Sequence, residues 1–90
     1  MAVVTPMDPH SLGLMALATA VSDERRAQRF LDLTGIGTDE LRDRAGDPAL
    51  LVALIRFLEA HEPDPIAVAA AMDVKPEALV AARQELEEQE

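Results

Sequence analysis

The chain has 90 residues, a net charge of −9 and no cysteine. Without cysteine it cannot form disulfides, thiolate metal sites or a cysteine nucleophile. The negative charge disfavours nucleic acids and anionic membranes as partners, and two phenylalanines without Trp or Tyr leave little for stacking on bases. The length indicates one domain. The N-terminus shows no basic and apolar leader, so we expect a cytoplasmic protein without a membrane segment.

Residues 1–7 show no periodicity and are predicted to be a disordered tail, while residues 8–21 predict the first helix. This helix begins with an Asp-Pro pair, because Asp is a good N-cap and Pro fits the first helical position. It is apolar most of the way round, so it is either buried or bound to a partner. If the core cannot cover it, Leu12, Met15 and Thr19 are where a partner helix or a second copy would dock.

Two further helices are predicted between residues 22 and 46. Ser22 is expected to cap the first of them and Gly35 to end it as a C′ glycine. Thr38 is expected to cap the second. Gly46 ends it, and because the next helix starts at once, this glycine is predicted to have a positive φ.

The central element of the chain is the apolar stretch 47–61. Asp47 and Pro48 repeat the cap-and-proline signature, and a continuous apolar run follows, too short to span a bilayer. Apolar residues at i, i+3, i+4 and i+7 predict a helix that is covered on more than one side. Leu51, Leu54, Ile55 and Leu58 occupy these positions.

Residues 66–86 predict two helices joined by a tight turn, a pattern that resembles a helix-turn-helix. Its second helix offers Arg83 and Gln84 beside several glutamates, whereas a DNA reader needs Lys and Arg around its base-reading residues. We therefore expect a structural hairpin, with Val74 of the turn in the core. Nucleic-acid binding through residues 66–86 is kept as an alternative.

One basic cluster stands out, made of Arg25, Arg26 and Arg29. Arg25 and Arg29 are one helical turn apart and could hold a carboxylate or a phosphate bidentately. A small-ligand site is therefore a second alternative. The competing interpretation is an outward, solvated face paired with nearby acids. Arg42, Arg44 and Arg56 could join the cluster, and Asp23, Asp32 and Asp43 could neutralise it.

Neither histidine lies in a metal-binding pattern, because His10 and His61 stand alone without an H-x-x-x-H spacing. The carboxylates occupy faces predicted to be exposed, without an apolar pocket to raise a pKa. We therefore expect no catalytic residues, no metal and no cofactor, and do not expect an enzyme.

The stretch RFLDLTGIGTDELRDRAGDPALLVALIRFLEAHEP, residues 29–63, together with the 66–86 hairpin, resembles a family of small proteins found mainly in alphaproteobacteria. The shared pattern runs from residue 14 to residue 86, and that family is catalogued as a domain of unknown function. Its matching residues are mostly caps and core, so they specify a fold better than an activity. The resemblance implies a bacterial, cytoplasmic protein.

These patterns predict an all-α protein, a compact bundle of five to six short helices around residues 47–61. One helical domain spans 8–87, and an acidic frayed tail covers 88–90. We expect a non-catalytic protein-interaction module, regulatory in a broad sense, which binds a protein partner or itself. The predicted core comprises Leu14, Leu17, Val21, Phe30, Leu31, Ile36, Leu41, Leu51, Leu54, Ile55, Phe57, Leu58, Ile66, Ala69, Met72, Val74, Leu79, Val80 and Leu86.

Overall fold

A computed structural model describes residues 8–61 and 64–89, so the predicted tail at 1–7 and the last residue of the predicted frayed end lie outside the described residues. The described part contains six helices and no strand, which confirms the all-α prediction. The helices are α1 (Pro9–Val21), α2 (Glu24–Thr34), α3 (Thr38–Asp43), α4 (Pro48–Ala60), α5 (Asp64–Ala71) and α6 (Pro76–Glu87).

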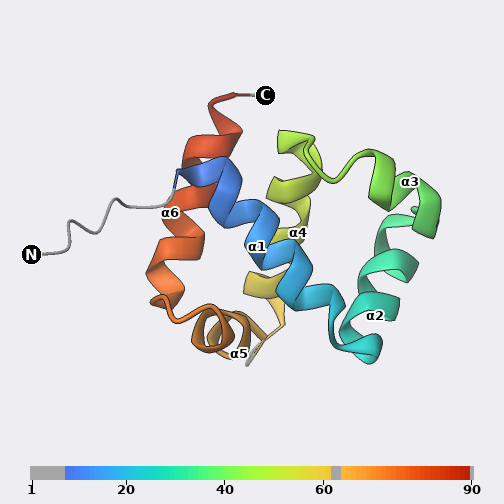
Figure 1. Cartoon of the computed structure of the whole chain (residues 1–90), viewed down its shortest axis with the longest axis horizontal. Helices are drawn as coiled ribbons and strands as arrows, with labels where there is room; N and C mark the ends of the chain where they lie inside the picture. The colour runs from blue at the N-terminus through green and yellow to red at the C-terminus, as the bar shows by residue number, and fades with distance from the viewer. Residues whose placement is uncertain (1–7, 62–63, 90) are drawn as a thin grey trace, which may run out of the picture.

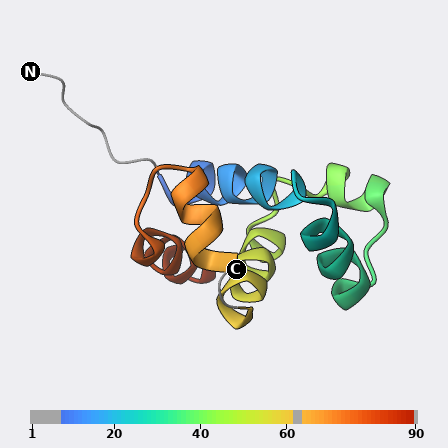
Figure 2. The ribbon, with the colours of Figure 1, turned by 90° about the horizontal axis from the view of Figure 1, so that it is seen from below.

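Helix α4 lies at the centre of a bundle with α1, α5 and α6, while α2 and α3 lie together at one end of the molecule (Figure 1). Helix α1 packs on both α4 and α6, and α2 packs mainly on α1. The view from below shows α2 and α3 set apart from α5 and α6, with α1 running along one edge (Figure 2). The Cα radius of gyration is 12.6 Å, as expected for a compact chain of this length. We refer to α2 and α3 together as the arm.

The two cap-and-proline starts are formed as predicted. The Asp8 carboxylate accepts a hydrogen bond from the backbone N–H of Ser11 at 2.8 Å, and Asp47 accepts from the N–H of Ala49 at 3.0 Å. Each side chain satisfies one N–H group that a helix start leaves without a partner. The start of α4, on which the bundle is centred, is therefore encoded locally.

Two predicted caps are wrong by one residue. Asp23, and not Ser22, is the N-cap of α2, because its carboxylate accepts from a backbone N–H of the first turn at 3.0 Å. Ser22 instead closes α1, where its hydroxyl donates to the Thr19 carbonyl at 2.6 Å. Likewise Gly37 is the N-cap of α3, and Thr38 is already helical. An adjacent acid or glycine supplies the extended backbone of the cap in each case.

Two described residues have a left-handed backbone conformation, and only one of them was predicted. Gly35 has φ = 73° and closes α2, as expected. Gly46 is not among the described residues with positive φ, so that prediction is wrong. The second left-handed residue is Asp73, with φ = 58° between α5 and α6. The N–H of Val74 there donates to the Ala69 carbonyl, which together with a bond from Asp73 forms a Schellman motif.

The core is centred on α4, and much of it follows the prediction. Ile66 is the clear error, since it is 53% exposed. Leu31 and Val80 are half-buried. Helix α5 is apolar on almost every side, so periodicity could not decide which side faces inward. Partly buried members that pack on the core are Leu14, Val21, Ile36, Leu41, Met72 and Val74, and buried residues outside the prediction are Leu12, Ala16, Ala20, Leu50, Val52, Val68 and Ala82.

Gly13 lets α1 approach α4 and α6 closely. A Cβ atom at this position would lie 3.1 Å from Cδ1 of Leu51 and 3.3 Å from Cδ1 of Leu86. Both leucines are fully buried, so neither has free space to move into. The absence of a side chain at Gly13 therefore sets the distance between three helices.

Candidate functional site

The predicted contact face on α1 is divided between core and surface. Leu12 is 8% exposed and belongs to the core, so its place in a docking face was wrong. Met15 is 42% exposed, and Thr19 is half-buried. Helix α1 is apolar on nearly every side, which is why the sequence could not tell its inner face from its outer one. Of the three residues, only Met15 is exposed.

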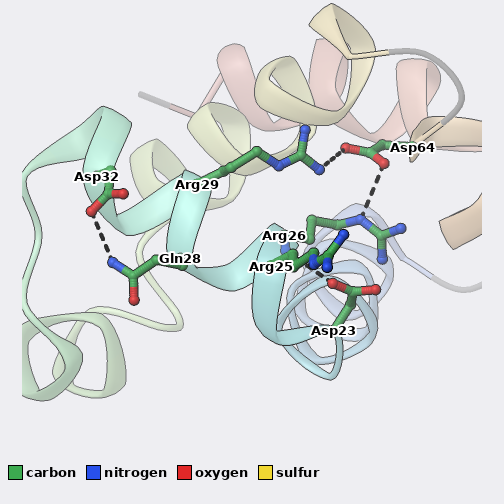
Figure 3. A pocket seen from close by; sticks show the side chains of 7 residues that line it. All are labelled: Asp23, Arg25, Arg26, Gln28, Arg29, Asp32 and Asp64. Atoms are coloured by element: carbon green, nitrogen blue, oxygen red, sulfur yellow. Dashed lines mark hydrogen bonds and ion pairs between the residues drawn. The ribbon is translucent and has the colours of Figure 1, made fainter.

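The basic cluster on α2 is held by a carboxylate from another helix. Arg29 Nη2 donates to Oδ2 of Asp64 at 2.7 Å, and Arg26 Nε lies 3.4 Å from Oδ1 of the same residue (Figure 3). The Asp64 side chain is 10% exposed. Arg26 was expected to point outward, yet its side chain is 15% exposed. We call this three-residue contact the Asp64 clasp, because it joins α2 to α5.

The clasp lines an open hollow of about 580 Å³, a volume that a small ligand could fill. Its charged lining balances, however, with three arginines against three aspartates. An anion that binds Arg26 and Arg29 would have to displace the buried Asp64 carboxylate. The observed geometry therefore describes an interhelical contact, and it does not favour an anion site. The lining consists of Asp23, Arg25, Arg26, Gln28, Arg29, Asp32 and Asp64.

The other arginines do not join this cluster. Arg44 pairs with Glu40 and Asp47, each at 3.3 Å, and Arg56 pairs with Glu87. Arg42 makes no ion pair with any carboxylate in residues 8–61 and 64–89. Arg44 and Arg56 thus pair with acids away from the Asp64 carboxylate. Arg42 is exposed and has no ion-pair partner in the described chain.

The predicted hairpin is present, but Arg83 of its second helix forms ion pairs within the bundle. Arg83 Nε donates to Glu59 of α4 at 2.6 Å, and Nη1 donates to Glu87 at 2.7 Å. The hydrogen bond with Glu59, followed by the charges of both glutamates, raises the pKa of Arg83. Helix α6 packs on α1 and α4, and its exposed polar residues are acids or glutamines. Glutamates facing solvent would repel phosphates, which weighs against DNA reading by this helix.

Both histidines have structural neighbours. His10 Nε2 lies 2.7 Å from the carbonyl oxygen of Gly46, which ties the start of α1 to the corner before α4. The ring of His61 lies 5.2 Å from the ring of Phe57. Among the described residues, no group of three or more His, Cys, Asp or Glu side chains is arranged to hold a metal ion. None of the helices in that part of the chain is long and apolar enough to cross a bilayer.

An apolar groove lies between the last two turns of α1 and helix α3, and we call it the α1–α3 groove. Its volume is about 270 Å³, just below the range of enclosed small-molecule pockets. Arg42 is the one charged residue in the lining. Ala18 lies exposed in its wall, so the groove is open to solvent. The lining comprises Leu17, Ala18, Val21, Thr38, Leu41, Arg42 and Ala45.

The sequence contains the parts of this groove but not their arrangement. Leu17, Val21 and Leu41 were all predicted to face inward, and each does contact the core. Helix α3 has six residues and makes no extensive contact with another helix in the described chain. Its apolar side therefore faces α1 across a gap. Helical periodicity reports which side of a helix is apolar, and it does not report whether that side is filled.

A comparison with known families matched residues 6–89 to a family described as "Protein of unknown function (DUF3572)". No curated protein and no solved structure matched the chain.

Proposed function

The chain belongs to the DUF3572 family, whose description leaves its function open, and we propose that it is a non-catalytic protein-interaction module. The observation that supports this is the α1–α3 groove, which is open and apolar and lies between α1 and the arm. A groove of this kind suits the apolar side chains of a partner helix. The proposal includes a bacterial, cytoplasmic setting, which rests on the composition and on the resemblance described above.

The size of the groove indicates what kind of complex to expect. Fully burying one Leu or Ile side chain of a partner contributes roughly 1.5–3 kcal/mol. A volume of about 270 Å³ leaves room for few such side chains. The interface would then fall at the small end, under about 1,200 Å², where transient signalling contacts are found. We therefore propose a reversible interaction, consistent with a regulatory role.

Ala18 offers a direct test, because it is exposed and lies in the wall of the groove. Ala18→Glu would place a charge among apolar side chains. The matched control is Ala67→Glu, since Ala67 is also an exposed helical alanine but lies on α5, outside the groove. Exposed substitutions of this type change stability by about 0.5 kcal/mol or less, which thermal melts would verify.

The tagged wild type and both variants would be incubated with an extract of native cells at moderate salt, and bound proteins would be identified by mass spectrometry. We expect one protein that is retained by the wild type and by Ala67→Glu but lost with Ala18→Glu. A partner that binds all three equally, or a bait that retains nothing, would contradict this function.

A further inference from the structure

The α1–α3 groove carries a charge as well as an apolar surface, and this charge specifies its partner. Arg42 lies at the groove and is exposed. No carboxylate of residues 8–61 and 64–89 forms an ion pair with it, although the chain is strongly acidic. Five other arginines, in contrast, pair with acids of their own chain. An unpaired cation beside an apolar groove is complementary to an apolar segment that carries an acid.

We propose that the groove receives an amphipathic helix of a partner protein, with a carboxylate that pairs with Arg42. This proposal rests on the function proposed above and adds the chemistry of the partner. Two apolar residues one turn apart would lie against Leu17 and Leu41. An Asp or Glu about one turn further along would reach the guanidinium group, which can hold a carboxylate bidentately. The helix-in-groove geometry presents its anchors at i, i+3, i+4 spacing, which places apolar anchors and an acid on adjacent positions of one face.

The choice of a partner over a second copy also follows from charge and exposure. The large apolar side chains that are exposed in the described chain are Met15, Leu33 and Ile66, one each on α1, α2 and α5. No helix among them presents two large exposed anchors one turn apart. A second copy would also bring another net charge of −9 against this acidic surface. A partner segment with few acids beyond the one at Arg42 avoids that repulsion.

The test uses the full chain and a defined probe, a phage-displayed library of random 12-residue peptides. Peptides would be selected on the wild type after removal of those that also bind Ala18→Glu. Parallel selections would use Arg42→Glu, Arg42→Gln and the control Arg25→Glu. Arg25 is the other arginine without an ion pair in the described chain, and it lies outside the groove. All variants are exposed substitutions, and circular dichroism would verify their folding.

We expect the wild type and Arg25→Glu to select peptides with two apolar residues at helical spacing and an Asp or Glu. Arg42→Glu should select Lys or Arg at the same position. A rim ion pair contributes about 0.2–1 kcal/mol, so Arg42→Gln should weaken binding of the selected peptide about 1.4- to fivefold. Changing the acid of that peptide to Lys should restore binding to Arg42→Glu. Amide chemical shifts would locate the bound peptide at Ala18, Leu41 and Ala45.

The outcomes separate this inference from the proposed function. Peptides that occupy the groove without an acidic preference would overturn the partner chemistry and leave the function standing. If no peptide depends on the groove, both proposals fail. Light scattering that shows a dimer of the wild type, broken by Ala18→Glu, would assign the groove to a second copy and overturn the acidic partner helix.

Discussion

Gly13 shows how one residue sets the spacing of the bundle. Helical propensity alone would favour alanine here by about 1 kcal/mol. The structure opposes this, because a Cβ atom would lie 3.1 Å from Cδ1 and 3.3 Å from Cβ of Leu51. The Leu51 Cβ is fixed to the backbone of the central helix and cannot turn away. Overpacking of this kind destabilises by about 1–3 kcal/mol, which exceeds the gain in propensity.

We therefore expect Gly13→Ala to lower the free energy of unfolding by about 1 kcal/mol, the difference between these two effects. Urea denaturation would measure it. The control is Gly46→Ala, because a Cβ atom there would meet the His10 ring at an ordinary 3.8 Å and φ is not positive. This control should leave stability unchanged or raise it by up to about 1 kcal/mol. Equal effects of the two substitutions would contradict the account of Gly13.

Single residues also mark where sequence reasoning succeeded and failed. The caps at Asp8 and Asp47 were predictable, because an Asp-Pro pair acts within one helical turn. The partner of Arg29 was not predictable, since Asp64 is distant from it in sequence. Asp64 is the first residue of α5, and its buried carboxylate pairs with Arg26 and Arg29 of α2. Capping rules act within one helical turn, so they do not report a contact between residues 35 positions apart.

At the scale of elements, the arm is attached to the bundle by few contacts. Phe30 of α2 is buried and meets the ring of Phe57 edge-on at 5.4 Å. The Arg29 guanidinium lies 5.6 Å from the same ring, a cation–π distance. The Asp64 clasp supplies the polar part of the attachment. Loss of the clasp should therefore loosen α2 while the central bundle stays folded.

We expect Asp64→Asn to lower the free energy of unfolding by about 2 kcal/mol. Removing one partner of a fully buried ion pair typically destabilises by about 3–5 kcal/mol, and the effect is smaller here because the Arg29 side chain is 47% exposed. Hydrogen exchange should accelerate at the amides of α2 more than at those of α4. The control is Asp32→Asn, an exposed acid on α2 whose loss should change stability by less than about 0.5 kcal/mol. Equal behaviour of the two variants would contradict a clasp.

For the hairpin and the groove, the sequence pattern predicted the helices but not how they contact one another. The sequence predicted both helices of the hairpin and the inward position of Val74, which packs on the core. It could not predict that Arg83 turns toward Glu59 of α4. It also could not predict the groove, because whether two apolar sides meet depends on how α3 is placed by its connections. Such placement is a property of the assembled helices.

For the whole molecule, the proposed function rests on where the apolar surface and the charges lie. The helical bundle buries its large side chains around α4 and leaves an apolar groove where the arm meets α1. The surface carries a net charge of −9, and Arg42 is the cation at that groove. The composition gave the net charge, and the apolar periodicity predicted the core. The expectation of an interaction module came from the lack of a catalytic or metal-binding pattern in the sequence. The position of the groove required the three-dimensional structure.

The most direct test of this account is the amide NMR spectrum of the ¹⁵N-labelled chain, recorded in buffer and then in an extract of native cells. We predict that signals of Ala18, Val21, Leu41 and Ala45 shift or broaden in the extract, while those of Ala67 and Ala70 on α5 do not. When the ¹⁵N-labelled Ala18→Glu variant is used instead of the wild type, adding the extract should leave the signals of Val21, Leu41 and Ala45 unchanged. Unperturbed groove signals in the wild type, or perturbation centred on α6 or on the Asp64 clasp, would contradict the proposal that this groove is the functional surface.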